Sequence, residues 1–516
     1  MRFKILVIFV FMLCGNIVAQ SESQISCTKI IGNHIDGVEI TKASLVASGT
    51  VMPPPYPGSP SIGPLPEHCL VNAIINRRKG LNGEEFGIRF ALALPIASNW
   101  NGDFMMQGGG GGNGIVSYPT GASYAGDKSG LERGFAVAST DTGHEAKVGP
   151  FDFGFMQDQQ AYLDFAFLAN AEVATVAKTI VAHYYQKPPT YSYFIGCSTG
   201  GREGMILSQR YPTIFNGIVS GDPAMRTGLS NLAIGKWIPI AYNQAAPKDA
   251  SGKPQLDKFL TDEDRKLFMD GLLNRCDAMD GVKDGMISNP MACDFDPVVL
   301  SCKEGQHSGC VAPEKIEAIK KAFGGPKNAY GTNVYPGFLY DTGIADNSAI
   351  PGLLALGDKG LFGPYPNAIT IDVDREALGA SDALVEPAST NLSTFSGDGG
   401  KILFFHGDSD PWFSALDTLG YYRSLAGANG GPENVEQWSR LFLVPGMRHC
   451  AGGQSLDQFD MLGAVVNWVE KGVAPDSVIA KGKAFPGRTR PLCAYPKHAQ
   501  YSGHGNADEA ANFNCN

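Results

Sequence analysis

The chain has 516 residues, 43% of them hydrophobic and 18% charged, so it can bury a large core and carry several domains or one large insertion. Its 41 basic and 51 acidic residues give a net charge of −10. Because no basic run is dense enough to neutralise phosphates, this balance argues against a nucleic-acid partner or an anionic membrane surface.

The first twenty residues have the pattern of a secretory signal peptide. Arg2 and Lys4 precede an apolar stretch, 5–13, that is too short to span a bilayer, and cleavage is expected just after Ala19 or Gln20. No later stretch is long and apolar enough for a membrane helix, so no membrane span is expected. The sequence therefore predicts a secreted or periplasmic protein.

Ten cysteines remain after removal of the signal peptide. An even number in an oxidising compartment predicts up to five disulfide bonds. No C-x-x-C pair is present, so a zinc or thioredoxin-type site has little support. The spacing suggests the local pairs Cys27–Cys69, Cys276–Cys293, Cys302–Cys310 and Cys493–Cys515, and leaves Cys197 and Cys450.

The order of the predicted elements is that of an α/β protein. Strands, glycine-rich loops and one long helix alternate, which implies a parallel sheet. The predicted strands lie in 87–95, 101–114, 134–144, 191–196 and 216–224, and the helix covers 158–185.

A different pattern begins near residue 225. Short helices, four cysteines and a Gly/Pro/Asn-rich middle predict an inserted cap over 225–399. Strand and loop patterns return in 399–413 and 440–450, and a last helix covers 459–471. We therefore expect a signal peptide (1–20), a first core segment (21–224), the cap (225–399) and a second core segment (400–516).

The segment FIGCSTGG, 194–201, contains the spacing G-x-S-x-G around Ser198. An apolar strand enters the motif and a plausible helix leaves it, which is the strand-turn-helix geometry that exposes a nucleophilic serine. The tight turn requires small neighbours, and Gly196 and Gly200 supply them. A simple strand-to-helix turn is the alternative interpretation.

A nucleophilic serine needs a base and a residue that orients the base. Two loops after apolar strands fit the expected order of Ser, acid and His, and they supply Asp410 and His449. Asp408 competes with Asp410 for the role of the acid. His406 and His144 also lie near strand ends, where a structural or pocket role is the better interpretation.

Two further features follow from this assignment. If Ser198 and His449 meet, their neighbours Cys197 and Cys450 are close enough for a disulfide that ties the base loop to the nucleophile turn. The oxyanion formed on attack needs backbone donors, and we expect the Thr199 amide and one amide from the glycine-rich segment 107–114.

The cap contains the segment CDAMDGVKDGMIS, with Asp277, Asp280 and Asp284 close together. Three carboxylates with glycines for turning suit a hard cation such as calcium. The spacing does not fit an EF-hand, and a solvated acidic turn is the alternative.

At these residues the sequence resembles the tannase and feruloyl esterase family of α/β-hydrolases over nearly the whole mature chain. The segments GCSTGGREGMILSQRYP, HGDSDPWFSALDT and FLVPGMRHCAGG match the Cys-Ser, Asp and His-Cys signature of the family. The likeness is greatest to the bacterial branch that contains mono-hydroxyethyl terephthalate hydrolase.

The resemblance implies an α/β-hydrolase core with a large inserted cap and a Ser198–Asp410–His449 triad. It also implies Gly111 as the second oxyanion donor. It implies structural calcium on the Asp277, Asp280 and Asp284 side chains and on the carbonyls of Val282 and Met286, and it matches all five disulfide pairs.

We therefore expect a secreted serine carboxylesterase that hydrolyses small esters of aromatic, feruloyl- or galloyl-type acids through an acyl-enzyme. The alternatives are a terephthalate monoester hydrolase and an inactive hydrolase fold used for binding. Cap residues Leu353, Leu354, Leu361, Phe362 and Tyr365 are candidates for an acyl pocket, with core packing as the alternative. The oligomeric state is left open.

Overall fold

The computed structural model describes residues 26–32, 34–53, 61–348, 350–357, 359–360 and 363–516. The expected signal peptide and two of the cap residues, Leu361 and Phe362, lie outside the described residues. The chain divides into two compact units, Met1–Ile218 and Val219–Asn516, and passes from one to the other within strand β9 (Gly217–Gly221).

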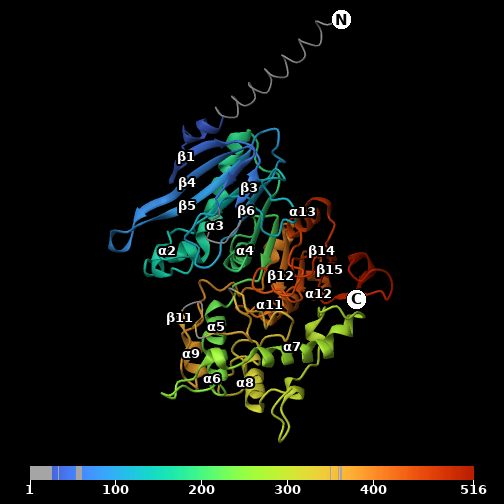
Figure 1. Ribbon diagram of the computed structural model, residues 1–516. Helices are drawn as coiled ribbons and strands as arrows, with labels where there is room; N and C mark the ends of the chain where they lie inside the picture. The colour runs from blue at the N-terminus through green and yellow to red at the C-terminus, as the bar shows by residue number, and fades with distance from the viewer. Residues whose placement is uncertain (1–25, 33, 54–60, 349, 358, 361–362) are drawn as a thin grey trace. The chain divides into compact units, whose positions relative to one another are not determined.

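Six strands form a mixed sheet in the first unit (Figure 1). The expected parallel arrangement holds for the neighbours β7, β6 and β8, whereas β1, β4, β5 and β7 pair antiparallel. The connection between β4 and β5 is too short for the crossover that a parallel pair needs. In spatial order the strands are β1 (Val38–Val46), β4 (His68–Lys79), β5 (Glu85–Pro95), β7 (Ala136–Thr140), β6 (Phe104–Gln107) and β8 (Ser192–Cys197), and β2 (Thr50–Met52) pairs separately with β3 (Ile62–Leu65).

The long helix expected over 158–185 is interrupted by a π-helical turn. It comprises α2 (Gln159–Leu163), the π turn Asp164–Leu168 and α3 (Ala169–Tyr185). Arg202 of α4 (Thr199–Arg210) is 1% exposed and donates hydrogen bonds to Phe165 O at 3.1 Å and Ala166 O at 2.9 Å. The arginine thus supplies donors to carbonyls in the π turn.

Among the described residues, one helix, Gln159–Tyr185, is long and apolar enough by length and composition to cross a membrane. This finding corrects the expectation that no stretch after the signal peptide is long and apolar enough for a membrane helix. Of the most apolar window of Gln159–Tyr185, 56% is buried within the protein. Val173, Ala177, Ile180 and Val181 of α3 are fully buried, and α3 contacts β5, β6 and β7. Packing against the sheet therefore accounts for the apolar face of this helix.

The second unit carries the two strands whose ends hold the proposed acid and base. β12 (Lys401–Gly407) and β13 (Ser439–Val444) are parallel, and Asp222, just after β9, donates its backbone N–H to Phe405 O at 2.9 Å. The helices α11 (Ala415–Ala428), α12 (Pro432–Val435) and α13 (Met461–Lys471) follow, and α13 contacts β12. Two hairpins end the chain, β14 (Ser477–Lys481) with β15 (Thr489–Cys493) and β16 (Ala499–Tyr501) with β17 (Phe513–Cys515).

The segment expected to form the cap has its own hydrophobic core. Leu353 and Leu354 are each 2% exposed within this core, and Tyr365 packs against it. Core packing, rather than an acyl pocket, therefore describes these three residues. The elements of the segment are α5 (Thr227–Leu232), α6 (Ile238–Asn243), α7 (Asp262–Cys276), α8 (Pro313–Phe323), β10 (Lys359–Gly360), β11 (Gly363–Pro364), α9 (Val373–Leu378) and α10 (Ser393–Gly397).

Disulfide bonds are present, as the cysteine count predicts. The structure contains the four local pairs that the spacing suggests, which are Cys27–Cys69, Cys276–Cys293, Cys302–Cys310 and Cys493–Cys515.

Candidate active site

Ser198 occupies the sharp turn between β8 and α4, with φ 62° and ψ −123°. A non-glycine residue rarely adopts this conformation, and the surrounding structure must hold it there. The two glycines of the motif permit the turn. A Cβ at Gly196 would lie 2.4 Å from the carbonyl carbon of Gly200, and a Cβ at Gly200 would lie 2.9 Å from Gly109 O. The local geometry is that of a nucleophile elbow.

The glycine-rich loop after β6 contacts the start of α4. Gly200 N donates to Gly109 O at 3.1 Å, and the Thr199 hydroxyl donates to Gly111 O. Gly111 has φ +59°, and a Cβ there would lie 2.3 Å from Pro150 O, so only glycine fits. The structure thus brings together Gly111 and Thr199, the residues expected to bind the oxyanion.

Glu203 accepts hydrogen bonds from this loop, and its role was not predicted from the sequence. It is 2% exposed, and its two carboxylate oxygens accept from Gly109 N at 3.1 Å and from Asn113 Nδ2 at 2.5 Å. Burial raises the pKa of this carboxyl. A glutamate among the small and apolar residues that follow Ser198 is the signal that points to it.

Asp410 and His449 lie in the loops that follow β12 and β13, and they form a hydrogen-bonded pair. His449 Nδ1 lies 2.7 Å from Asp410 Oδ2. Because a carboxylate only accepts, Nδ1 carries the hydrogen and, in the neutral ring, Nε2 carries the lone pair. Nε2 forms no hydrogen bond within the part of the chain that the structure describes. The imidazole is therefore in the tautomer that a general base requires.

Asp410 is fixed in position by its own loop. It is 2% exposed, and its Oδ1 accepts from Trp412 N at 2.8 Å and Phe413 N at 3.1 Å. Burial raises its pKa, but the opposing charges and hydrogen bonds of His449 and His406 outweigh burial and hold the pKa below its usual range. The carboxylate thus stays ionised and keeps its partner histidine oriented.

Asp408, the competing acid, lies in a different environment. It is 4% exposed, and neither of its carboxylate oxygens has a hydrogen-bond partner among the described residues. Burial and the neighbouring Asp341 carboxylate raise its pKa well above the usual value. An acid that is held neutral cannot stabilise an imidazolium, so the geometry favours Asp410 for this role.

The two other histidines near strand ends have structural surroundings. His144 is 1% exposed and stacks on Phe155 with ring centres 3.5 Å apart. Burial lowers the pKa of His144 to about 4, so it is neutral near pH 7. His406 is fully buried behind Asp410.

Asp222 is a further buried residue, and its role was not predicted from the sequence. It is fully buried, and its carboxylate accepts from Gly407 N at 2.7 Å and from Cys450 N at 3.1 Å. It therefore joins the end of β12 to the residue that follows His449. An aspartate directly after a buried strand, in SGDPA, is the signal that points to it.

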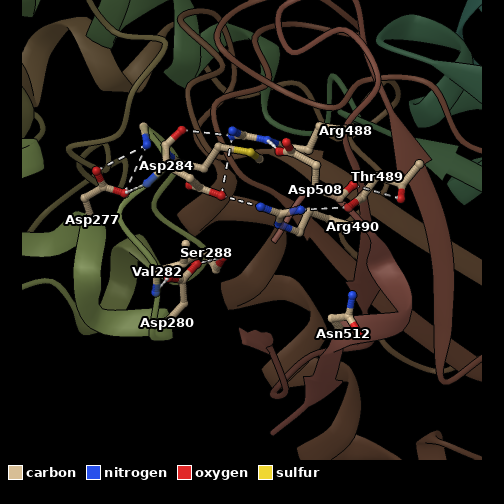
Figure 2. A network of polar contacts seen from close by, with 12 residues as sticks. Asp277, Asp280, Val282, Asp284, Ser288, Arg488, Thr489, Arg490, Asp508 and Asn512 are labelled. Atoms are coloured by element: carbon tan, nitrogen blue, oxygen red, sulfur yellow. Dashed lines mark hydrogen bonds and ion pairs between the residues drawn. The ribbon is translucent and has the colours of Figure 1, made fainter. Parts of the chain in front are cut away.

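The acidic turn in 277–286 holds three largely buried carboxylates, those of Asp277, Asp280 and Asp284, which are shown with their bonds in Figure 2. Asp277 Oδ1 accepts from Asp284 N at 3.0 Å and Gly285 N at 3.1 Å, and Asp280 accepts from the Ser288 hydroxyl at 2.5 Å. Gly281 and Gly285 have φ values of +93° and +83°, which let the chain turn back on itself.

Two arginines of the second unit face this turn. Arg490 forms an ion pair with Asp284, and Arg488 Nη1 donates to Asp284 O at 2.9 Å (Figure 2). Arg488 also pairs with Asp508 at 2.8 Å. The oxygen donors have the chemistry that a hard cation prefers, while Arg490 already neutralises part of their charge. The proposed ligands Val282 and Met286 lie in the same turn, where each backbone N–H donates to an aspartate.

The family model described as tannase and feruloyl esterase matches residues 73–351 and 369–516. The chain belongs to this family. Mono(2-hydroxyethyl) terephthalate hydrolase from Piscinibacter sakaiensis is 37% identical to it, and the alignment covers 89% of this chain and 86% of that protein.

Solved structures agree with this assignment. The structure of an esterase from Aspergillus oryzae superposes on this chain with a TM-score of 0.78, and the two sequences are 25% identical. The superposition covers 96% of this chain and 100% of that one. Feruloyl esterase B from the same organism has a TM-score of 0.77 at 25% identity, with 99% of that chain and 95% of this one covered. The resemblance seen in the sequence is thus confirmed: the protein is a carboxylic ester hydrolase with an α/β-hydrolase fold.

Proposed function

We propose that the protein is a serine carboxylesterase that hydrolyses small esters of aromatic acids through an acyl-enzyme. Ser198 is the nucleophile, His449 the general base and Asp410 the residue that orients the base. The observation that carries the proposal is the hydrogen bond of 2.7 Å between Asp410 Oδ2 and His449 Nδ1, which leaves Nε2 able to accept a proton. The strained turn at Ser198 supports it.

In the first half-reaction, His449 Nε2 takes the proton of the Ser198 hydroxyl as Oγ attacks the ester carbonyl. The Thr199 and Gly111 backbone N–H groups stabilise the oxyanion of the tetrahedral intermediate. His449 then returns the proton to the leaving alcohol, and the acyl group stays on Ser198. Water, activated by the same imidazole, releases the acid and regenerates the serine.

An aromatic acyl group is favoured by the surroundings of His449. The ring centres of Trp412 and Phe413 lie 4.6 Å and 5.3 Å from that of His449. Trp412 is partly exposed and offers apolar area to a flat ring next to the base, whereas Phe413 is buried. Feruloyl- and galloyl-type esters are the substrates we propose, and a terephthalate monoester is the second candidate because of the relative from Piscinibacter sakaiensis.

A panel of esters with one alcohol and different acyl groups tests the substrate class. We expect feruloyl, galloyl and benzoyl esters to exceed straight-chain esters of similar size in kcat/KM by roughly ten- to a hundredfold, the value of burying a ring. A preference for short aliphatic esters contradicts the proposal. A terephthalate monoester that exceeds all others establishes the second candidate, and no hydrolysis of any ester favours a binding protein.

We also propose that a fifth disulfide joins Cys197 to Cys450 and that residues 1–20 are a signal peptide that directs secretion. The disulfide would close a loop of about 250 residues, for which the chain-entropy model gives roughly 5 kcal/mol of stabilisation. Mass spectrometry of the exported, unreduced protein should find the two cysteines in one linked peptide pair and an N-terminus after residue 19 or 20. Alkylation of a Cys197 thiol in active protein contradicts the disulfide.

The acidic turn is proposed to bind one structural calcium ion through Asp277, Asp280 and Asp284 and the carbonyls of Val282 and Met286. The three carboxylates repel each other, and a cation would remove that repulsion. Binding to the folded state alone stabilises it by mass action, so a chelator should lower Tm by several degrees and added calcium should restore it.

Two carboxamide variants provide the matched comparison for calcium. Asp284→Asn should abolish the response of Tm to calcium. Asp294→Asn removes an exposed carboxylate that pairs with Arg275 in the same segment and should leave the response intact. If the chelator has no effect on the unmodified protein, the ion pair between Asp284 and Arg490 neutralises the turn without a metal.

A further inference from the structure

His406, in β12, lies next to Asp410, the partner of His449. Its Nε2 lies 2.9 Å from Phe413 O, 3.4 Å from Asp410 Oδ2 and 3.7 Å from Asp222 Oδ1. Its Nδ1 lies 2.8 Å from the Thr418 hydroxyl. Because a carbonyl oxygen only accepts, Nε2 must carry a hydrogen, and that hydrogen is surrounded by three oxygens.

The cluster is compact and excluded from solvent. His406 and Asp222 are fully buried and Asp410 is 2% exposed. One ligand atom of each of these three residues lies within 4.8 Å of the other two. At such distances in a dry interior, a charge on the His406 ring acts strongly on both carboxylates.

The two carboxylates near His406 favour a positive charge on its ring. Burial lowers its pKa, but Asp222 and Asp410 outweigh burial and raise the pKa to about 9. Burial raises the pKa of Asp222 to about 6, so this carboxyl is largely ionised at pH 7 and above. The titratable groups that face or electrostatically influence His406 are Asp222 after β9, Asp408 and Asp410 after β12, Asp417 in α11 and, through Asp410, His449 after β13.

We infer that His406, held by Asp222, is a positioning residue that sets the pH range in which His449 can act as the base. The inference rests on the proposed function and deepens it. His449 and His406 contact the same oxygen, Asp410 Oδ2, at 2.7 and 3.4 Å. The imidazolium of His406 offsets part of the negative charge of the Asp410 carboxylate that it shares with His449, so a proton on His449 is less favourable than it would be beside Asp410 alone.

The direction of the effect follows from this charge balance. Without the His406 charge, the Asp410 carboxylate holds a proton on the base more strongly, so the base is lost at a higher pH than in the unmodified protein. The acid limb of the pH profile of kcat/KM therefore moves upward when the charge is removed. A histidine that serves only as a packed, hydrogen-bonded core residue changes stability but does not move this limb.

The test is His406→Gln, which keeps an N–H donor but removes the charge. We expect the acid limb to move up by about one pH unit, as for the loss of a like charge at this range, while activity persists above the limb. His68→Gln is the matched control. His68 is also fully buried and forms two hydrogen bonds of 2.7 Å, to Pro66 O and the Tyr118 hydroxyl, with no carboxylate partner among the described residues. The acid limb of the kcat/KM profile of His68→Gln should stay in place.

A folded, active His406→Gln variant whose limb does not move, or moves no more than that of His68→Gln, overturns the inference. NMR of histidine-labelled Ser198→Ala protein gives a second readout, which is the protonation state of the His406 ring. This measurement requires no catalytic activity, and it does not depend on whether His406→Gln folds. The signal perturbed by Thr418→Val identifies His406, and it should remain protonated from pH 6 to 8. Deprotonation within that range overturns the inference, whereas loss of serine-dependent hydrolysis alone affects only the proposed function.

Discussion

Ser198→Ala should abolish ester hydrolysis and leave the fold intact. The alanine removes the Oγ that forms the acyl-enzyme, and neither Asp410 nor His449 can replace it. Loss of a nucleophile of this kind lowers kcat by about 10⁴- to 10⁶-fold, because the oxyanion donors and substrate binding still provide a residual rate. The measurement is kcat for a chromogenic ester, with Tm to confirm folding.

Ser208→Ala is the matched control for this substitution. Ser208 lies in α4, is 2% exposed and donates to Met205 O at 2.8 Å, so the variant loses a buried hydroxyl away from the turn. It should lower Tm by a few degrees and keep kcat within a factor of a few. Near-normal turnover by folded Ser198→Ala would falsify the serine mechanism.

The elements that carry the site could be predicted from the sequence because their patterns are local. The apolar strand before Ser198, the glycines beside it and the strands before Asp410 and His449 are each visible within about ten residues. The antiparallel half of the sheet was not predicted, because strand order and direction depend on which distant strands pair. β7 follows β6 in the chain but lies between β6 and β5.

The choice between Asp408 and Asp410 shows where sequence reasoning stops. Both residues lie in one loop after β12, and the same pattern describes both. Only the structure shows that Asp410 reaches His449, while Asp408 is buried against Asp341 and its pKa is raised. Glu203 was missed for a related reason, because its partners Gly109 and Asn113 come from a loop 94 and 90 residues earlier in the chain.

The segment expected to form the cap shows why apolar character alone does not identify a substrate pocket. Leu353 and Leu354 have the apolar character of a substrate pocket, but the same character fits a core, and they are buried in the core of the cap segment. Trp412 and Phe413 are instead the aromatic residues near the base, and they follow Asp410 directly in the sequence. Substrate selectivity is therefore better sought in the loop after β12 than in those leucines.

Asp410→Asn should lower kcat by about 10⁴-fold while changing the shape of the site little. The Asp410 carboxylate accepts the Nδ1 hydrogen of His449 and so leaves Nε2 as the base. A carboxamide can turn its NH₂ group toward Nδ1, which moves the ring hydrogen to Nε2 and removes the base. It also removes the negative charge that stabilises the imidazolium formed during attack.

Asp408→Asn is the control for Asp410→Asn. It removes a buried acid from the same loop but leaves the carboxylate that orients His449. Asp408 is held neutral by burial and by Asp341, and it has no hydrogen bond to His449, so its carboxamide should keep kcat within about tenfold. The pair of variants is compared by kcat and Tm on the same ester. If Asp408→Asn proves the more damaging to kcat at equal stability, the acid has been assigned to the wrong aspartate. If the two variants lose activity only in proportion to their loss of stability, neither carboxylate orients the base.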